Sequence, residues 1–408
     1  MKILFLNPPS PDGHIYIRDI NRSGRRSREH TIWPQTSLAL LAAMFPEHEV
    51  EILDCIADGI NFHELSIRIA GFQPDWVIVE SVSCTFDSDM SVVEITKNLT
   101  DAKVAVISPH SEALHDETLK KYPFIDHLID YEKDFDSAKP IKEPEAHLRE
   151  LITGIPDNTP FEELPVARQD LLPRHKYSLP FIGRGYTFVI TSRGCPWTCI
   201  YCRQGVTWKN RVRYRPVEKV IEEIDKYGLT NVAFHADTFT VNRNWVLQLC
   251  SKIPKGVRWV CNSRVDTVDP ELLHRMREAG CWMICYGIES GNNRVLQMNE
   301  KGKGGTVENA IKAVRWAKEA GIKVWTYMML GMYGDDMDSM RDTIRLSKRL
   351  SGDICNFALS APYPGTKWGK IAQEKNWITD PSWGAYDQNV SAIVDQPGCT
   401  HQQVKAMQ

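Results

Sequence analysis

Apolar runs of strand length alternate with amphipathic helical segments in two separate stretches of this 408-residue chain. In the first stretch the runs are Lys2–Asn7, Glu49–Cys55, Asp75–Ser83, Lys103–Pro109 and His127–Tyr131. Helical patterns lie between them, near residues 36–45, 62–71, 87–99 and 111–121. Because strand–helix–strand units form parallel sheets with helices on both faces, this pattern predicts a doubly wound α/β domain over residues 1–135.

The second stretch repeats the alternation. Its strand-like runs are Tyr186–Ser192, Asn231–Asp237, Val257–Ser263, Trp282–Glu289, Lys323–Leu330 and Ile354–Ser360. Helical patterns separate them, near residues 216–228, 242–252, 269–279, 306–320 and 336–350. These units are too few for a closed barrel of eight strands, so we expect an open (β/α)6 barrel over residues 181–366, with its site at the carboxyl ends of the strands.

Two further segments lack this pattern. Residues 136–180 are rich in Pro, Asp and Glu and are predicted to be a linker. Residues 367–408 contain Trp368, Trp377, Trp383 and Tyr386 and form a C-terminal extension. The extension could cap the barrel or close over a substrate, and its sequence predicts no fold.

Charge and hydropathy exclude several classes of protein. The formal net charge of −3 gives no reason to expect nucleic acid or an anionic membrane as a partner. Apolar runs such as Ser37–Phe45 are far shorter than the ~20 residues of a membrane span. The first ten residues do not resemble a signal peptide, and eleven cysteines then indicate a reducing compartment. We therefore expect a cytoplasmic protein.

The loops of the first domain limit its ligands. They contain neither GxGxxG nor GxxxxGK[ST], which disfavours a nicotinamide or nucleoside triphosphate site. The loop after the first run is long and basic and carries Arg18, Arg22, Arg25, Arg26 and Arg28. Two interpretations stay open for it: a solvated loop, or a flap over an anionic ligand.

Three cysteines, Cys195, Cys199 and Cys202, follow the first strand of the second stretch. Thiolates bind iron–sulfur clusters, and three of them can each hold one iron of a cubane while the fourth iron stays open. A zinc site would need a fourth ligand, and a disulfide would leave an odd thiol in a reducing compartment. The trio therefore predicts a 4Fe-4S cluster. Cys281 and Cys285 have CxxxC spacing on one predicted strand, where alternation places both on one face, so a second metal there is a minor alternative.

The pattern Cys195-x3-Cys199-x2-Cys202, with Tyr201 before the last cysteine, resembles the signature of the radical S-adenosylmethionine (SAM) superfamily. Over residues 186–366 the strand ends also resemble its motifs: HADTFTVN, CNSRVD, GIESG, MMLGMYGDD and APYPGT. The first domain resembles the Rossmann-like cobalamin-binding domain of the methyltransferase class, through NPP, WPQTSLALLAAM and SPHSEALHDETL. The resemblance implies a cobalamin domain, a partial radical SAM barrel and a short extension.

The resemblance also implies roles for individual residues. It implies SAM contacts from Tyr201, Asp237, Arg264, Glu289 and Gly331. Asp237 has the alternative role of a helix N-cap, and Arg264 with Glu289 that of an ordinary ion pair at the barrel mouth. Cobalamin contacts are implied for Pro8, Pro34, Ser83, Thr85, Ser108 and His110. No catalytic side chain is predicted.

Two features depart from relatives of the first domain. The stretch DGHIYI (Asp12–Ile17) lacks the spacing of the DxHxxG motif, whose histidine binds cobalt from below. The lower ligand is therefore unassigned and could be water, an unexpected side chain or nothing; the side-chain candidates include His14, His110 and His115. Ser108 stands where relatives usually carry a glycine.

The resemblance implies a cobalamin-dependent radical SAM C-methyltransferase. A deoxyadenosyl radical would take hydrogen from an unactivated carbon, on a protein side chain or a small molecule, and methylcobalamin would supply the methyl group. The enzyme would work anaerobically with a ferredoxin- or flavodoxin-like electron donor. Alternatives are a radical oxidase or cyclase like the anaerobic porphyrin-ring cyclase, and a ligand-sensing protein with a structural cluster. A tRNA methylthiotransferase would need a further cluster domain, for which Cys55 and Cys84 are too few.

Overall fold

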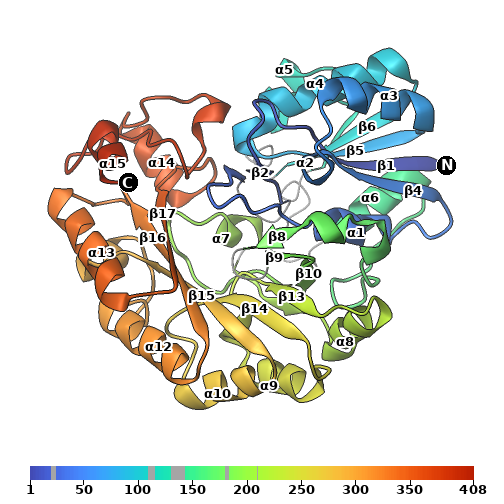
Figure 1. Cartoon of the computed structure of the whole chain (residues 1–408). Coiled ribbons are helices and arrows are strands. Elements are labelled where there is room, and N and C mark those ends of the chain that lie inside the picture. The colour runs from blue at the N-terminus through green and yellow to red at the C-terminus, as the bar shows by residue number, and fades with distance from the viewer. Residues whose placement is uncertain (20–23, 109–114, 130–142, 180–182, 209) are drawn as a thin grey trace. The chain divides into compact units, whose positions relative to one another are not determined.

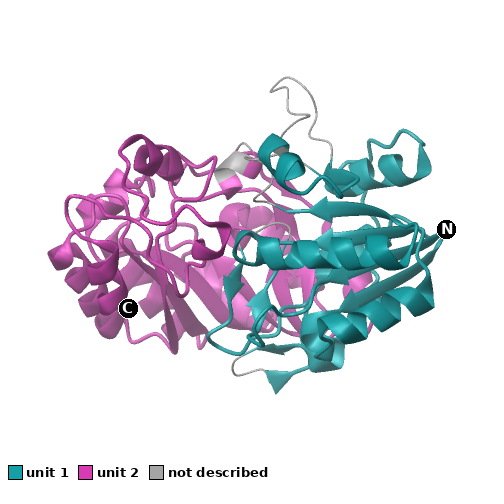
Figure 2. Ribbon diagram, turned by 90° about the horizontal axis from the view of Figure 1, so that it is seen from above, with its two compact units in different colours: residues 1–187 teal, residues 188–408 magenta. Residues whose placement is uncertain are grey.

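The computed structural model describes residues 1–19, 24–108, 115–129, 143–179, 183–208 and 210–408. These residues form two compact units, Met1–Thr187 and Phe188–Gln408, which Figure 2 colours separately. Each unit is described by itself below. The division predicted from the sequence, with boundaries after residues 135, 180 and 366, stays a prediction.

The described part of the first unit contains a parallel sheet in the order β4-β1-β5-β6-β7. Its strands are β1 (Lys2–Asn7), β4 (Glu49–Asp54), β5 (Trp76–Glu80), β6 (Lys103–Ile107) and β7 (His127–Ile129). The helices are α1 (Thr36–Ala42), α2 (Cys55–Asp58), α3 (Phe62–Phe72), α4 (Phe86–Leu99), α5 (His115–Lys121) and α6 (Pro144–Thr153). Helices α3 and α4 cover one face of the sheet, and α1 and α6 the other (Figure 1). The doubly wound fold is confirmed.

The strand order identifies where a ligand would sit. In chain order the sheet reads 2-1-3-4-5, so the direction of winding reverses between β1 and β5. Open sheets of this type bind ligands beyond the carboxyl ends of the strands at such a switch point. The loops after β1 and β5 therefore border the expected ligand position.

The segment predicted as a linker is folded where the structure describes it. Helix α6 begins with Pro144 at its first turn and ends at Gly154, which has φ 71°. Phe161, Leu164 and Tyr177 are completely buried in the first unit. The short elements η2 (Gln169–Leu171), η3 (Arg174–Lys176) and β8 (Ser178–Leu179) complete the segment, and β8 pairs with β9 (Gly183–Arg184) just beyond it. The high Pro and acidic content of the segment favoured the prediction of a linker, although these three buried side chains attach it to the first unit.

The second unit contains, in its described part, a sheet in the order β10-β13-β14-β15-β16-β17, and β13 to β17 pair in parallel. The strands are β10 (Thr187–Ile190), β13 (Asn231–His235), β14 (Arg258–Ser263), β15 (Cys281–Glu289), β16 (Lys323–Leu330) and β17 (Ile354–Leu359). The hairpin β11 (Ser192–Arg193) and β12 (Arg213–Tyr214) follows β10. This is the open barrel sheet expected from the sequence.

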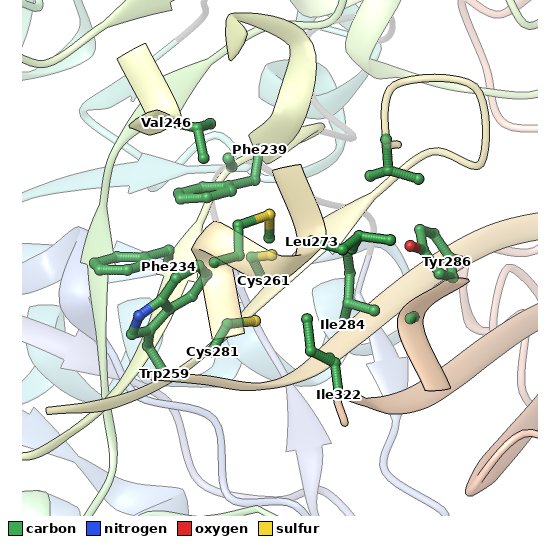
Figure 3. Packing of buried hydrophobic residues seen from close by; sticks show 14 of the residues in the cluster. Phe234, Phe239, Val246, Trp259, Cys261, Leu273, Cys281, Ile284, Tyr286 and Ile322 are labelled. Carbon is green, nitrogen blue, oxygen red and sulfur yellow. The ribbon is translucent and has the colours of Figure 1, made fainter. Parts of the chain in front are cut away.

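Helices cover the outer face of this sheet (Figure 1). They are α8 (Val217–Lys226), α9 (Arg243–Lys252), α10 (Pro270–Glu278), α12 (Val307–Glu319) and α13 (Met337–Leu350). The smaller helices α7 (Gln204–Thr207), η4 (Phe239–Val241) and α11 (Asn293–Met298) lie in the loops. Figure 3 shows the core between sheet and helices, where Phe234, Trp259 and Phe239 pack against one another.

The expectation that Cys281 and Cys285 share a face is wrong. The register between β14 and β15 shifts at Trp259/Val260, where Cys281 pairs with Trp259 and Met283 with Val260. Cys281 therefore joins Ile284 in the helix-facing core, and Cys285 lies on the other side of the strand. The described residues also contain no group of three or more His, Cys, Asp or Glu side chains placed around one metal ion.

The C-terminal extension is folded and packs on the barrel unit. It contains α14 (Lys367–Glu374), η5 (Trp383–Ala385) and α15 (His401–Met407). Trp368 is completely buried and forms a core cluster with Ile200, Tyr363 and Tyr386. Among the described residues, the structure has no helix whose length and apolar character would suit it to cross a membrane.

Candidate functional site

The cysteine loop begins directly after β11, at the carboxyl end of β10. Gly194 opens it with φ 92°, and a Cβ there would lie 1.7 Å from the carbonyl oxygen of Arg211. Only glycine fits this position without displacing backbone. The N–H of Gly194 donates to Oδ2 of Asp237 at 2.8 Å, so the end of β13 holds the start of the loop.

The C-terminal extension holds the middle of the same loop. Between the second and third cysteines, the carbonyl of Ile200 accepts a 2.9 Å hydrogen bond from the backbone N–H of Trp368. The N–H of Ile200 donates to the carbonyl of Asn299 at 3.2 Å. Both backbone groups of Ile200 are thus hydrogen-bonded to other segments, which brace the middle of the loop.

The three thiols are partly buried on this loop. Burial raises the pKa of Cys195 and, with repulsion from the neighbouring sulfurs, raises that of Cys202 further. Without a cation these two thiols would stay protonated, and a metal would have to displace the protons. The trio does not surround a single ion, and in a cubane each thiolate binds a different iron. Three soft ligands on a braced loop fit a 4Fe-4S cluster.

Arg264 lies against this loop from the end of β14. Its Nη1 is 3.9 Å from Sγ of Cys199, and its guanidinium carbon lies 4.1 Å from the centroid of the Trp197 ring. Nε and Nη2 donate to the two carboxylate oxygens of Asp266, each at 2.8 Å. The ordinary ion pair expected as an alternative is thus formed with Asp266 and not with Glu289.

Glu289 instead pairs with Lys301. Oε1 of Glu289 lies 2.9 Å from Nζ of Lys301, which also donates to the hydroxyl of Tyr201 at 3.2 Å. Glu289 has φ 73° and follows a register irregularity at the end of β15, which turns its side chain toward this group. A non-glycine residue in this conformation costs ~1–3 kcal/mol, and such strain concentrates at functional sites. The pair is almost buried, with exposed side-chain fractions of 12% and 6%.

Gly331, an implied SAM contact at the end of β16, lies against the C-terminal extension. Its φ of 74° requires glycine, and a Cβ there would lie 2.8 Å from Cγ1 of Val404 in α15. Gln396 donates to the neighbouring carbonyl of Met332 at 2.8 Å. The glycine therefore accommodates the C-terminal extension on that side.

The cobalamin contacts implied for the first unit lie, where the structure describes them, in the loops after β1, β5 and β6. Ser83, Thr85 and Ser108 are buried at the ends of β5 and β6. Thr85 is already bound, because its hydroxyl donates to Asp89 at 2.7 Å. Pro8 and Pro34 are buried in the loop between β1 and α1. His110 lies outside the described residues.

Arg18 departs from the interpretation of the basic loop as solvated, because its guanidinium is buried. Arg22 lies outside the described residues, and the flap over an anionic ligand stays a prediction. The side chain of Arg18 is completely buried and forms a 2.7 Å ion pair with Asp89, which is also completely buried. The guanidinium further donates to Asn7 Oδ1 and to the carbonyls of Pro8 and Pro9, at 2.9 to 3.2 Å. Arg18 therefore joins the loop after β1 to the helix after β5.

This buried network extends to the neighbouring strand β4. Nδ2 of Asn7 donates to Asp54 at 2.7 Å, and the hydroxyl of Tyr177 donates to the other oxygen of Asp54 at 3.0 Å. Burial raises the pKa of Asp54 to about 6, although these hydrogen bonds lower it. His14, a candidate lower ligand, lies in an exposed part of the loop and contacts Asp12 at 3.2 Å.

Sequence reasoning missed Lys301 and Asp266, and it named Trp368 only as one of the aromatic residues of the extension. Asp266 stands two residues after Arg264 in CNSRVD, where a carboxylate beside an arginine was a usable signal. Lys301 and Trp368 are far from Tyr201 in the sequence, and the motif around Tyr201 gives no sign of them. Only the fold brings them together.

The chain is similar to a known protein family and to several known proteins. The radical SAM superfamily model matches residues 189–347. An uncharacterized methyltransferase of Pyrococcus horikoshii is 30% identical over 411 residues, covering 95% of this chain and 86% of the relative. An anaerobic magnesium-protoporphyrin IX monomethyl ester cyclase of Rubrivivax gelatinosus is 22% identical, covering 89% of this chain and 68% of the relative.

Solved structures share the fold at low identity. The radical SAM methyltransferase TsrM of Kitasatospora setae, solved with cobalamin and a 4Fe-4S cluster, gives a TM-score of 0.68 at 17% identity. The alignment covers 100% of this chain and 84% of TsrM. The cobalamin-dependent SAM radical enzyme OxsB gives a TM-score of 0.66 at 15% identity, over 96% of this chain and 64% of OxsB.

Proposed function

The chain belongs to the radical SAM methyltransferases, and from that premise we propose that it transfers a methyl group to an unactivated carbon with the help of cobalamin. The observation that carries the proposal is the braced loop of Cys195, Cys199 and Cys202, with a buried polar group beside it. When bound, a cluster and SAM supply a deoxyadenosyl radical, and cobalamin supplies a transferable methyl group.

The roles of this chain's residues follow from their positions. The three cysteines would hold the cluster, and Asp237 fixes the loop through Gly194. Tyr201, Glu289 and Lys301 form a nearly buried polar group that would bind the charged and ribose groups of SAM. Lys301 offers a cation for a carboxylate, and Glu289 an acceptor for hydroxyl groups.

Cobalamin would bind at the switch point of the first unit. Three features support this: the reversal of strand order between β1 and β5, the buried hydroxyl residues Ser83 and Ser108, and a rigid loop after β1. TsrM and OxsB, which share the fold, were solved with cobalamin. The substrate would be a protein side chain or a small molecule, and the electron donor a ferredoxin- or flavodoxin-like protein of the cytoplasm.

A radical oxidase or cyclase is the second candidate. It is favoured by the similarity to the cyclase of Rubrivivax gelatinosus along 89% of this chain. The mass of the product separates the two reactions, because methylation adds one methylene unit and cyclisation does not.

The test is anaerobic incubation of the reconstituted protein with SAM, cobalamin and a reductant, in the presence of cell extract. We expect deoxyadenosine and an extract component that is heavier by one methylene unit. Cys199→Ala should abolish both products, whereas Cys355→Ala, which changes an exposed cysteine on β17, should retain them. Equal product formation by the Cys199 variant would refute the cluster assignment.

A further inference from the structure

The guanidinium of Arg264 is fixed in one orientation. Besides its two hydrogen bonds to Asp266, Nη2 donates to the carbonyl of Lys301 at 2.6 Å. The side chain is 6% exposed. Burial alone would lower its pKa, but the hydrogen bonds and charge of Asp266 hold the pKa of Arg264 above its ordinary value. Arg264 is therefore a permanently charged group with little freedom to move.

Gly302 and Trp197 lie directly beside the guanidinium of Arg264. Gly302 has φ 88°, and a Cβ there would lie 3.2 Å from Cδ1 of Trp197 and 3.6 Å from Nη2 of Arg264. The chain at Gly302 can therefore pass close to the stacked pair. Trp197 lies between the first two cysteines, so Arg264 contacts the loop both at this ring and at the sulfur of Cys199.

The hydrogen bonds of Arg264 determine how many of its N–H groups remain for a ligand. A guanidinium has five N–H groups. Asp266 and Lys301 take three of them, and Nη1 directs a fourth at Cys199, so a single N–H of Nη1 remains. A bidentate clamp on the carboxylate of SAM needs two parallel N–H groups. Arg264 does not retain such a pair, which contradicts a role as the carboxylate clamp.

We propose that Arg264 raises the reduction potential of the cluster by donating an N–H···S hydrogen bond to its Cys199 ligand, and that it does not clamp the carboxylate of SAM. The inference rests on the proposed function. One electron passes from a ferredoxin- or flavodoxin-like donor, which is oxidised, to the cluster, which becomes more negative by one charge. A hydrogen bond and a positive charge stabilise the more negative state more strongly, so reduction becomes easier.

The test compares the holoprotein with Arg264→Gln and Arg264→Lys. Redox titration followed by electron paramagnetic resonance gives the midpoint potential, and equilibrium binding of SAM to the cluster-loaded protein gives Kd. Arg243→Gln is the matched control, because Arg243 is a half-exposed arginine paired with Asp269 and Glu271 in the same unit.

We expect the equilibrium constant for reduction to fall about tenfold in Arg264→Gln, which is ~59 mV for one electron. Arg264→Lys keeps the charge but loses the fork geometry, and should shift the potential in the same direction by less. SAM affinity should stay within about twofold of the unmodified protein in both variants. An unchanged potential, or a large loss of SAM affinity, would overturn the inference. Failure of the unmodified protein to assemble a cluster would instead refute the proposed function.

Discussion

Replacement of Arg18 tests whether the first unit depends on one buried ion pair. Arg18→Ala removes the six hydrogen bonds that the guanidinium forms with Asn7, Pro8, Pro9, Thr85 and Asp89. It leaves Asp89 buried without its cation. Removing one partner of a buried pair costs about 3–5 kcal/mol, which raises the population of opened molecules by about 10²- to 10⁴-fold.

The expected cost depends on pH. Burial already raises the pKa of Asp89, and the charge of Arg18 opposes that rise. In the variant the folded-state pKa of Asp89 therefore moves further above the value in the unfolded chain. Folding then favours the protonated acid, so the variant is least affected at low pH and loses stability as pH increases.

Amide hydrogen exchange in the intact 408-residue chain measures this cost in the first unit alone. We expect peptides from β1, β5 and α4 to exchange faster by the stated factor, and more so at pH 8 than at pH 6 after correction for intrinsic rates. The control is Arg26→Ala, which removes a partly exposed pair with Asp12 in the same loop. That change should accelerate exchange by less than about fivefold. Equal effects of the two variants would refute the reasoning.

Three further predictions concern the loop, the extension and pH. Gly194→Ala should sharply lower the iron and sulfide content of the reconstituted protein, because the new Cβ would lie 1.7 Å from the carbonyl oxygen of Arg211. Gly256→Ala is the control: Gly256 has φ 93°, but no atom lies within 4 Å of the added Cβ, so the contents should not change. Equal iron and sulfide contents in the two variants would contradict the clash. Trp368→Ala should lower the free energy of unfolding by about 3–5 kcal/mol and speed amide hydrogen exchange at residues 195–202. Trp383→Ala is the control and should have a smaller effect on both, because Trp383 is less buried. Asp54, with its pKa raised to about 6, stabilises the fold most when it is protonated. The stability of the first unit should therefore fall as the pH rises from about 4 to about 7. Asp54→Asn should weaken this pH dependence, as measured by amide hydrogen exchange at β4.

The fold was largely predictable because both sheets are built from continuous apolar strands. The run Lys323–Leu330 coincides with β16, and Asn231–Asp237 differs from β13 by two residues at one end. Such strands are buried on both faces and stand out from the amphipathic helices between them. The error at Cys281 and Cys285 arose because alternation assumes a regular strand, and the irregularity at Trp259/Val260 breaks it.

The site was only partly predictable. The cysteine trio is contiguous in sequence, and Arg264 and Glu289 end strands that the periodicity identified. The partners of Arg264 and Glu289 could not be predicted from the sequence. Glu289 pairs with Lys301 from the loop after α11, and Arg264 pairs with Asp266. Arg18 was misread for a related reason: a charge in a long loop usually faces water, and its burial depends on acceptors supplied by Pro8, Pro9 and Asp89.

A single-turnover reaction with SAM that carries a deuterated methyl group tests the central claim most directly. The reconstituted, reduced protein is mixed anaerobically with this SAM and cobalamin, and deoxyadenosine and methylcobalamin are measured by mass. The account predicts that both form, with the deuterated methyl group on cobalamin, and that Cys199→Ala forms no deoxyadenosine. Deoxyadenosine without any labelled methylcobalamin would contradict a cobalamin-dependent methyltransferase and favour the oxidase or cyclase.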